Sequence, residues 1–233
     1  MTTVGLLIPG HSAEEDYPRL EVLLDSDIRM PVVHTGSAEP SEADSAELRL
    51  GGAESVVWAS TSGSFDYGWE GAHRQIRELA KAAGLPASST SFGFVHAVRK
   101  LGAARVAVAA TYPQDKADRF TGFLRAAGVD VAATHARGAT PAEVAGWEES
   151  EVLALARAGD HPQADVVLLP DTALHTVAYL PELEDALGKP VLTATQVTVW
   201  EGLRLADRRT WALNVGRLFA RDGREADHLN GER

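Results

Sequence analysis

Short apolar runs that are continuous rather than alternating recur along this chain, and they constrain its fold more than any other feature. Several are rich in β-branched residues, as is typical of strands buried on both faces of a parallel sheet. The runs are Val4–Ile8, Ser55–Ala59, Val106–Ala110, Val129–Ala133, Val166–Leu169, Pro190–Leu192 and Ala212–Val215. Helical patterns separate them, at Gly71–Gly84, Ser91–Leu101, Gln114–Ala127 and Leu180–Leu187. This alternation predicts an α/β fold, in which ligands bind at loops that follow the strand ends.

The composition excludes several kinds of site and partner. The chain carries 33 acidic and 22 basic residues, a net charge of −11, which argues against a nucleic-acid or anionic-membrane partner. It contains no cysteine, so disulfides, thiolate zinc sites, iron–sulfur clusters and a cysteine nucleophile are all excluded. The pattern of a secretory leader or a membrane helix is not found, so a cytoplasmic protein is expected.

Two segments of the chain resemble each other in pattern. They are Ala53–Ser64 and Ala164–His175, and each runs from alanine and an acid through an apolar strand to a small polar residue followed by threonine. This alignment places Ser60 and Asp171 at equivalent points just past a strand end. If the repeat reflects two similar lobes, their strand-end loops face each other and offer N–H and hydroxyl donors to a small carboxylate or dicarboxylate.

A wider set of motifs gives the chain a family resemblance. These motifs are Gly5–Pro9, Thr61–Ser64, Arg105–Tyr112, Asp171-Thr172, Gly188–Ala194, Gln196 and Trp200–Arg204. Together they resemble the Asp/Glu racemase superfamily, in the branch of the maleate cis–trans isomerases and arylmalonate decarboxylases. The resemblance implies two flavodoxin-like lobes with parallel sheets, related by a pseudo-two-fold axis, with the active site between them. It also implies a homo-oligomer and chemistry without a metal or organic cofactor. We expect residues 1–95 plus 200–233 to form lobe 1 and residues 96–199 to form lobe 2.

The chain departs from this branch at the positions that carry its chemistry. The resemblance implies a cysteine at one or both of the positions of Ser60 and Asp171, and the decarboxylase keeps the second as a proton donor. Neither is present here, so thiolate attack and two-thiol racemisation are not available. The threonine, serine and tyrosine of the decarboxylase's carboxylate pocket match Thr61, Ser62 and Tyr112.

The residues at the two cysteine positions each have two interpretations. Ser60 either donates a hydrogen bond to a ligand or fills a tight turn. Asp171 either protonates a carbanion, if burial holds it in its protonated form, or caps a helix that begins at Thr172. In the second case His175 shares a helix face with Asp171 and favours a base role, or is simply a surface or cleft residue. Ser12, in the loop after the first strand, is a further candidate for the cleft.

Three functions follow from these observations. The first is a cofactor-independent decarboxylase of a small malonate-like dicarboxylic acid, in which Asp171 protonates an enediolate. Thr61, Ser62, Tyr112 and the backbone N–H of Thr172 supply its hydrogen-bond donors. The second is an isomerase or racemase that uses Asp171 with a partner such as His175. The third is a non-catalytic carboxylate-binding protein that keeps the scaffold.

Overall fold

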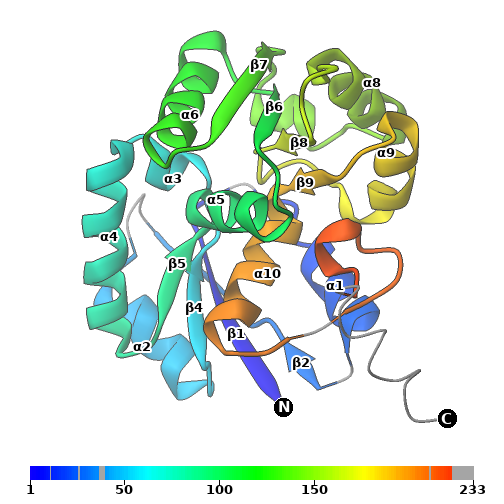
Figure 1. Ribbon diagram of the computed structural model, residues 1–233. Coiled ribbons are helices and arrows are strands. Elements are labelled where there is room, and N and C mark those ends of the chain that lie inside the picture. Colours follow the sequence, from blue (N-terminus) through cyan, green and yellow to red (C-terminus); the bar gives the residue numbers. More distant parts are fainter. Residues whose placement is uncertain (11, 26, 37–39, 210, 222–233) are drawn as a thin grey trace, which may run out of the picture.

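The computed structural model places the chain in two parallel sheets (Figure 1). It describes residues 1–10, 12–25, 27–36, 40–209 and 211–221. The first sheet contains β1 (Thr2–Ile8), β2 (Ile28–Arg29), β3 (Val32–His34), β4 (Ser55–Trp58) and β5 (Ala87–Ser89). The second sheet contains β6 (Arg105–Ala110), β7 (Asp130–Ala136), β8 (Val166–Leu169) and β9 (Val191–Thr193). The predicted α/β class is confirmed.

The two sheets share one topology. In the first, β1 pairs with β3 on one side and with β4 on the other, and β4 pairs with β5. In the second, β6 pairs with β7 and β8, and β8 pairs with β9. The short strands β2 and β3 pair with successive parts of β1 and count as one position. Numbered in this way within each lobe, both orders read 2-1-3-4, which is the flavodoxin-like order. The strands of the two similar segments, β4 and β8, therefore hold the same place in their sheets.

Helices connect the parallel strands and cover the sheets. In the first half of the chain they are α1 (Asp16–Leu24), α2 (Glu42–Leu50), α3 (Ser62–Phe65), α4 (Gly68–Ala83) and α5 (Thr90–Lys100). In the second half they are α6 (Gln114–Ala126), α7 (Pro141–Val144), α8 (Glu149–Gly159), α9 (Leu180–Leu187) and α10 (Ala194–Leu205). Short 3-10 turns lie at Val177–Tyr179 and Arg217–Phe219. No helix among the described residues combines the length and apolarity needed to cross a membrane.

The four predicted helices are confirmed as α4, α5, α6 and α9, and six of the seven apolar runs lie in strands. The prediction of a strand at the seventh run, Ala212–Val215, is wrong, because these residues form a turn. Asn214 in this turn has a φ of 66°, which a β-strand does not accommodate. The short strands β2 and β3 were not among the predicted runs.

Helices α5 and α10 lie between the two sheets (Figure 1). They hold equivalent places, directly after β5 and β9, and they pack on each other. A hydrogen bond of 2.7 Å joins the Thr90 and Thr198 hydroxyls across this contact.

The expected lobe boundaries, after residues 95 and 199, fall inside these two helices. Residues 210 and 222–233 of the segment expected in lobe 1 lie outside the described residues.

Candidate active site

The loops after β4 and β8 meet at the carbonyl of Pro170, the residue before Asp171. The Thr61 hydroxyl, from the first lobe, donates to this carbonyl at 2.6 Å. The Tyr112 hydroxyl, from the loop after β6, donates to the same oxygen at 2.9 Å. Thr61 and Tyr112 are both buried, and the Tyr112 ring packs on Phe65 at a centroid distance of 6.0 Å. The predicted meeting of strand-end loops from the two lobes is therefore present.

Asp171 is buried, with 8% of its surface exposed. Its Oδ1 accepts a hydrogen bond of 2.9 Å from the backbone N–H of Ala173, two residues later. This contact closes an Asx turn rather than capping a helix. The prediction of a helix that begins at Thr172 is wrong, because the next helical residues are those of the 3-10 turn that begins at Val177.

The second oxygen of Asp171 accepts a hydrogen bond from a residue outside the predicted site. The hydroxyl of Thr111, the last residue before Tyr112, donates to Asp171 Oδ2. Thr111 is fully buried. Its one signal in the sequence is its place next to Tyr112 at the end of a predicted strand. Both carboxylate oxygens thus have donors, one from their own loop and one from the loop after β6.

Ser60 and Ser62 line a cavity of about 530 Å³ beside this cluster. The other lining residues are Pro9, Gly10, Thr35, Gly36, Gly63, Asp66 and Tyr67. The Ser60 Oγ accepts a hydrogen bond of 3.0 Å from the Gly63 N–H, which leaves its own proton to donate. Asp66 is paired with Arg119 of the other lobe at 3.4 Å, so its charge is partly neutralised. Asp171, Thr61 and Tyr112 do not line this cavity.

The turn at Gly63 has no room for a side chain. A Cβ at this position would overlap the Trp58 Nε1 and lie 2.8 Å from the Ser60 Oγ. Trp58 is fully buried and its indole N–H has no hydrogen-bond partner among the described residues. Position 63 therefore requires glycine, because the Trp58 and Ser60 side chains lie too close to its Cα for a Cβ to fit.

The segment after Asp171 is held by the residues that lead into α1 and by Asp16, the first residue of that helix. The Thr172 carbonyl accepts hydrogen bonds from the Ala13 N–H at 2.8 Å and the Ser12 hydroxyl at 3.3 Å. Asp16 Oδ2 accepts hydrogen bonds from the N–H groups of Thr176 and Val177 at 2.9 and 3.1 Å. Ser12 therefore positions this loop, whereas none of the described residues accepts a hydrogen bond from the Thr172 N–H.

The His175 side chain lies against the acidic residues at the start of α1 and not against Asp171. Its ring nitrogens lie 3.7 Å from Asp16 Oδ1 and 3.8 Å from Glu15 Oε2. Because residues 172–176 do not form a helix, the expected shared face with Asp171 does not exist. The structure brings the Thr61 and Tyr112 hydroxyls to the Pro170 carbonyl and the Thr111 hydroxyl to the carboxylate of the next residue, Asp171.

Burial governs the ionisation of Tyr112. Burial first, and then the negative charge of Asp171, raise the pKa of this phenol well above its ordinary value. The Thr61 hydroxyl acts in the opposite direction but does not outweigh them. Tyr112 is therefore a neutral hydrogen-bond donor at any physiological pH. Among the described residues, no group of three or more histidine, aspartate or glutamate side chains is arranged to hold a metal ion.

Comparisons with known proteins agree with this architecture. An arylmalonate decarboxylase from Bordetella bronchiseptica is 27% identical over 230 residues, which cover 93% of this chain and 96% of that protein. A maleate isomerase from Geobacillus stearothermophilus is 24% identical over 137 residues, which cover 58% of this chain and 55% of that one.

Solved structures give the same result. A crystal structure of arylmalonate decarboxylase superposes with a TM-score of 0.81 at 26% identity, covering 93% of this chain and 98% of that chain. A Nocardia farcinica maleate cis–trans isomerase superposes with a TM-score of 0.85 at 20% identity, covering 97% and 100%. This second likeness shows the shared fold of two flavodoxin-like lobes. The sequence model of the arylmalonate decarboxylase family matches residues 34–219, so this chain belongs to the arylmalonate decarboxylase family.

Proposed function

We propose that this protein is a cofactor-independent decarboxylase of a small malonate-like dicarboxylic acid, with Asp171 as the proton donor. The observation that carries the proposal is the buried Asp171 carboxyl group beside the Pro170 carbonyl, where donors from both lobes converge. Ser60 and Ser62 flank Thr61 and line the adjacent cavity, so one substrate carboxylate is placed against them. Thr61, between these two serines, donates to the carbonyl of Pro170, the residue before Asp171, and so connects this cavity to the loop of the proton donor.

The chemical step needs only groups of this chain. Loss of CO₂ breaks the bond between the α-carbon and one carboxyl carbon and leaves the electron pair in an enediolate. Asp171 in its protonated form gives its proton to the α-carbon, and its carboxylate regains a proton from water. The Thr111 hydroxyl and the Ala173 N–H are already placed to stabilise the carboxylate formed in this step.

Donors for the enediolate oxygens come from the loops after β4, β6 and β8. The Ser60 hydroxyl proton and the Thr172 N–H are not used by the described residues, and Tyr112 stays neutral. Fixed donors aimed at developing negative charge are the largest contribution in many enzymes of this kind. The Thr61 and Tyr112 hydroxyls also donate to the substrate if one of its oxygens replaces the Pro170 carbonyl as their acceptor.

The maleate isomerases of the comparison suggest a route that this chain does not share. One structure of the Nocardia farcinica enzyme holds a covalently bound succinylcysteine intermediate. The present chain has no cysteine and cannot form such an adduct. A proton donor that never bonds to the substrate is compatible with an aspartate, which supports decarboxylation over cis–trans isomerisation.

The test is turnover of a panel of malonate, methylmalonate and phenylmalonate in D₂O, followed by NMR. We expect release of CO₂ and one deuterium at the α-carbon of the product. Asp171→Asn should abolish turnover, because the amide has no acidic proton of comparable strength. Asp185→Asn is the matched control, since Asp185 lies exposed on α9 and the same change there should leave turnover intact.

Three results would overturn the proposal. Full turnover by a folded Asp171→Asn protein would remove Asp171 from the mechanism. Deuterium wash-in without loss of CO₂ would instead indicate a racemase or isomerase. Thermal stabilisation by dicarboxylates with no turnover of any substrate would indicate a non-catalytic binding protein.

A further inference from the structure

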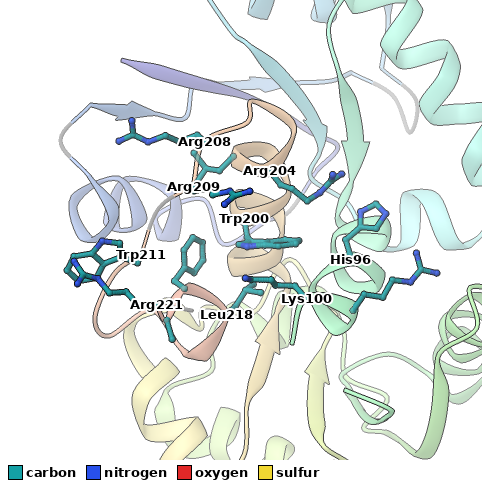
Figure 2. Close-up of a pocket in the computed structure, with 13 residues that line it drawn as sticks. His96, Lys100, Trp200, Arg204, Arg208, Arg209, Trp211, Leu218 and Arg221 are labelled. Carbon is teal, nitrogen blue, oxygen red and sulfur yellow. The ribbon is translucent and has the colours of Figure 1, made fainter. Parts of the chain in front are cut away.

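A second and larger cavity, of about 790 Å³, lies at the C-terminal ends of α5 and α10 (Figure 2). Two parts of the chain that are distant in sequence form it: the last turns of α5, and the end of α10 with the residues that follow it as far as Arg221. Trp200, on α10, lies at its centre in Figure 2, between His96 on one side and Trp211 on the other.

The charge of this cavity is opposite to that of the chain. Among the residues that the structure describes, six of the chain's 22 lysines and arginines line it and no acidic residue does. They are Arg99, Lys100, Arg204, Arg208, Arg209 and Arg221. Cations at the end of a helix are common because they complement its dipole. Here the ends of two helices and the chain that follows α10 bring their cations to one cavity in a protein of net charge −11. Such convergence raises mutual repulsion, which a bound anion would offset.

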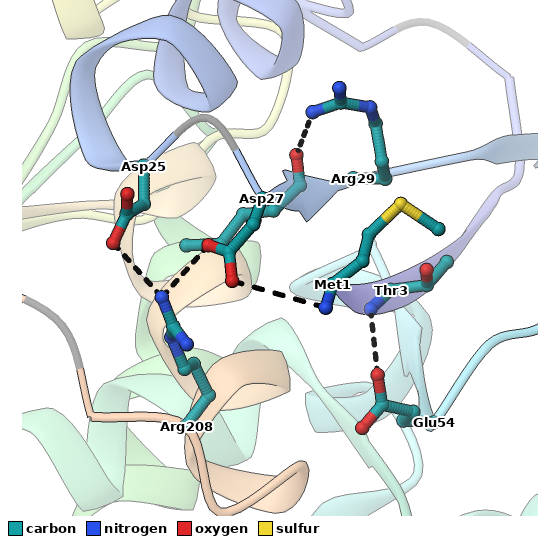
Figure 3. Close-up of polar contacts among 8 residues, drawn as sticks. Met1, Thr3, Asp25, Asp27, Arg29, Glu54 and Arg208 are labelled. Carbon is teal, nitrogen blue, oxygen red and sulfur yellow. Dashed lines mark hydrogen bonds and ion pairs between the residues drawn. The ribbon is translucent and has the colours of Figure 1, made fainter.

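Two of these cations already have carboxylate partners. Arg204 forms a bidentate pair with Glu201, with both contacts at 2.8 Å. Arg208 bridges Asp25 and Asp27 at 2.9 and 2.8 Å (Figure 3). These pairs fix one side of the cavity and contribute little net charge to it.

Arg99, Arg209 and Arg221 differ from these two ion-paired residues. Arg99 donates to the backbone carbonyl of Ala127 at 2.8 Å, which is a neutral acceptor. Arg221 stacks over the Trp211 ring at 3.8 Å. For Arg99, Arg209 and Arg221, the described part of the chain provides no carboxylate partner. Planar guanidinium groups of this kind bind phosphate oxygens in pairs.

The aromatic residues narrow the class of anion. Trp200 is half-buried against the core and presents the rest of its ring to the cavity, and Trp211 is 49% exposed at its edge. Flat rings bounded by arginines suit a ligand that has a planar ring as well as phosphates. The volume lies in the range of pockets that hold small molecules.

This cavity is separate from the candidate active site. Ser91, at the start of α5, donates to the Thr61 carbonyl at 2.6 Å, whereas Arg99 and Lys100 end the same helix. At a rise of 1.5 Å per residue, the eight residues from Ser91 to Arg99 span about 12 Å along the helix axis. We propose that this cavity is a binding site for a nucleoside phosphate, with the phosphates on Arg99, Arg209 and Arg221 and the ring against Trp200.

The experiment is calorimetric titration of the full chain with ATP, tripolyphosphate and adenosine at one fixed ionic strength. We expect saturable binding of ATP, at least tenfold tighter than that of tripolyphosphate or adenosine, because each of these lacks one half of the ligand. The double variant Arg99→Gln with Arg209→Gln should weaken ATP binding at least tenfold. Arg209→Gln alone serves if the double variant does not fold.

The matched control is Arg125→Gln with Arg157→Gln, which makes the same change of charge on the exposed faces of α6 and α8. It should bind ATP as the unchanged protein does. Equal weakening in the control would show attraction by general charge and would overturn the proposal. So would the absence of saturable binding, or tripolyphosphate binding as tightly as ATP. None of these results depends on decarboxylase activity, so the two proposals fail separately.

Discussion

The hydroxyl of Thr111 donates a hydrogen bond to Oδ2 of Asp171, and this contact joins the end of β6 to the loop after β8. Both residues are buried, and they lie 60 positions apart in the chain. The carboxyl group is therefore oriented by a neighbouring strand as well as by its own turn. Thr111 is a positioning residue for whatever chemistry Asp171 performs.

Thr111→Val tests this role, because valine keeps the shape and removes the donor. An acceptor left unsatisfied in a buried place costs about 1–3 kcal/mol, and each kcal/mol lowers the Tm of a chain of this size by about 2–4 °C. We expect this loss of Tm together with a lower kcat on the malonate panel. Thr111→Ser keeps the hydroxyl and should recover kcat. A Thr111→Val protein with unchanged kcat would show that the contact is structural alone.

Tyr112→Phe tests the ionisation of the phenol. Because the pKa of Tyr112 is raised, the folded protein keeps this proton while the unfolded chain loses it above about pH 10. The contribution of Tyr112 to stability is thus intact below that pH and is lost as the pH rises towards the raised pKa. The replacement should leave the absorbance titration of the folded protein unchanged up to about pH 11. The control is the same titration of the protein unfolded in guanidinium, where the chain has four tyrosines and Tyr112→Phe should remove the signal of one of them. A missing phenol in the folded titration would contradict the assignment.

Gly63→Ala tests the tight turn below the cavity. The added methyl group would meet Trp58 and Ser60, both of which are buried, so we expect a loss of about 1–3 kcal/mol in the free energy of unfolding. The matched control is Gly122→Ala in α6, where a Cβ meets nothing within 4 Å. That change should stabilise the protein by about 0.5–1 kcal/mol, as alanine does in a helix. Equal effects at the two positions would contradict the close approach at Gly63.

Glu201→Gln tests the buried charge between α10 and α5. Burial raises the pKa of this carboxyl group, but hydrogen bonds from Arg204 and His96 outweigh it, and the net pKa is lowered. Its contribution is therefore present above the ordinary glutamate pKa of about 4.3 and is lost as the pH falls through the lowered value. The stability difference between the unchanged protein and the variant should be largest near neutral pH and shrink in acid. Glu47→Gln, exposed on α2, should show little difference at either pH. A stability difference between the two proteins that grows as the pH falls would contradict the lowered pKa of Glu201.

Much of the fold could be predicted from the sequence because local patterns specify it. Continuous apolar runs marked six strands, and helical periodicity with glycine stops marked α4 and its end at Gly84, whose φ is 64°. The likeness between the segments around Ser60 and Asp171 placed both residues after equivalent strands. The strand expected at Ala212–Val215 was wrong, because a short run that Asn214 interrupts also fits a turn, from which Val215 packs on the core while Leu213 stays exposed.

The tertiary structure alone decided which side chains meet. The order of β6 beside β8 brings Thr111 to Asp171, and no pattern local to either residue shows this contact. The contacts of Asp16 with the N–H groups after His175 satisfy that segment without a helix, which separates His175 from Asp171. In the same way, the basic cavity exists only because the ends of α5 and α10 lie side by side. Residues distant in sequence are joined by hydrogen bonds and charges whose geometry depends on strand order and helix packing, and neither is encoded in the local pattern of either residue.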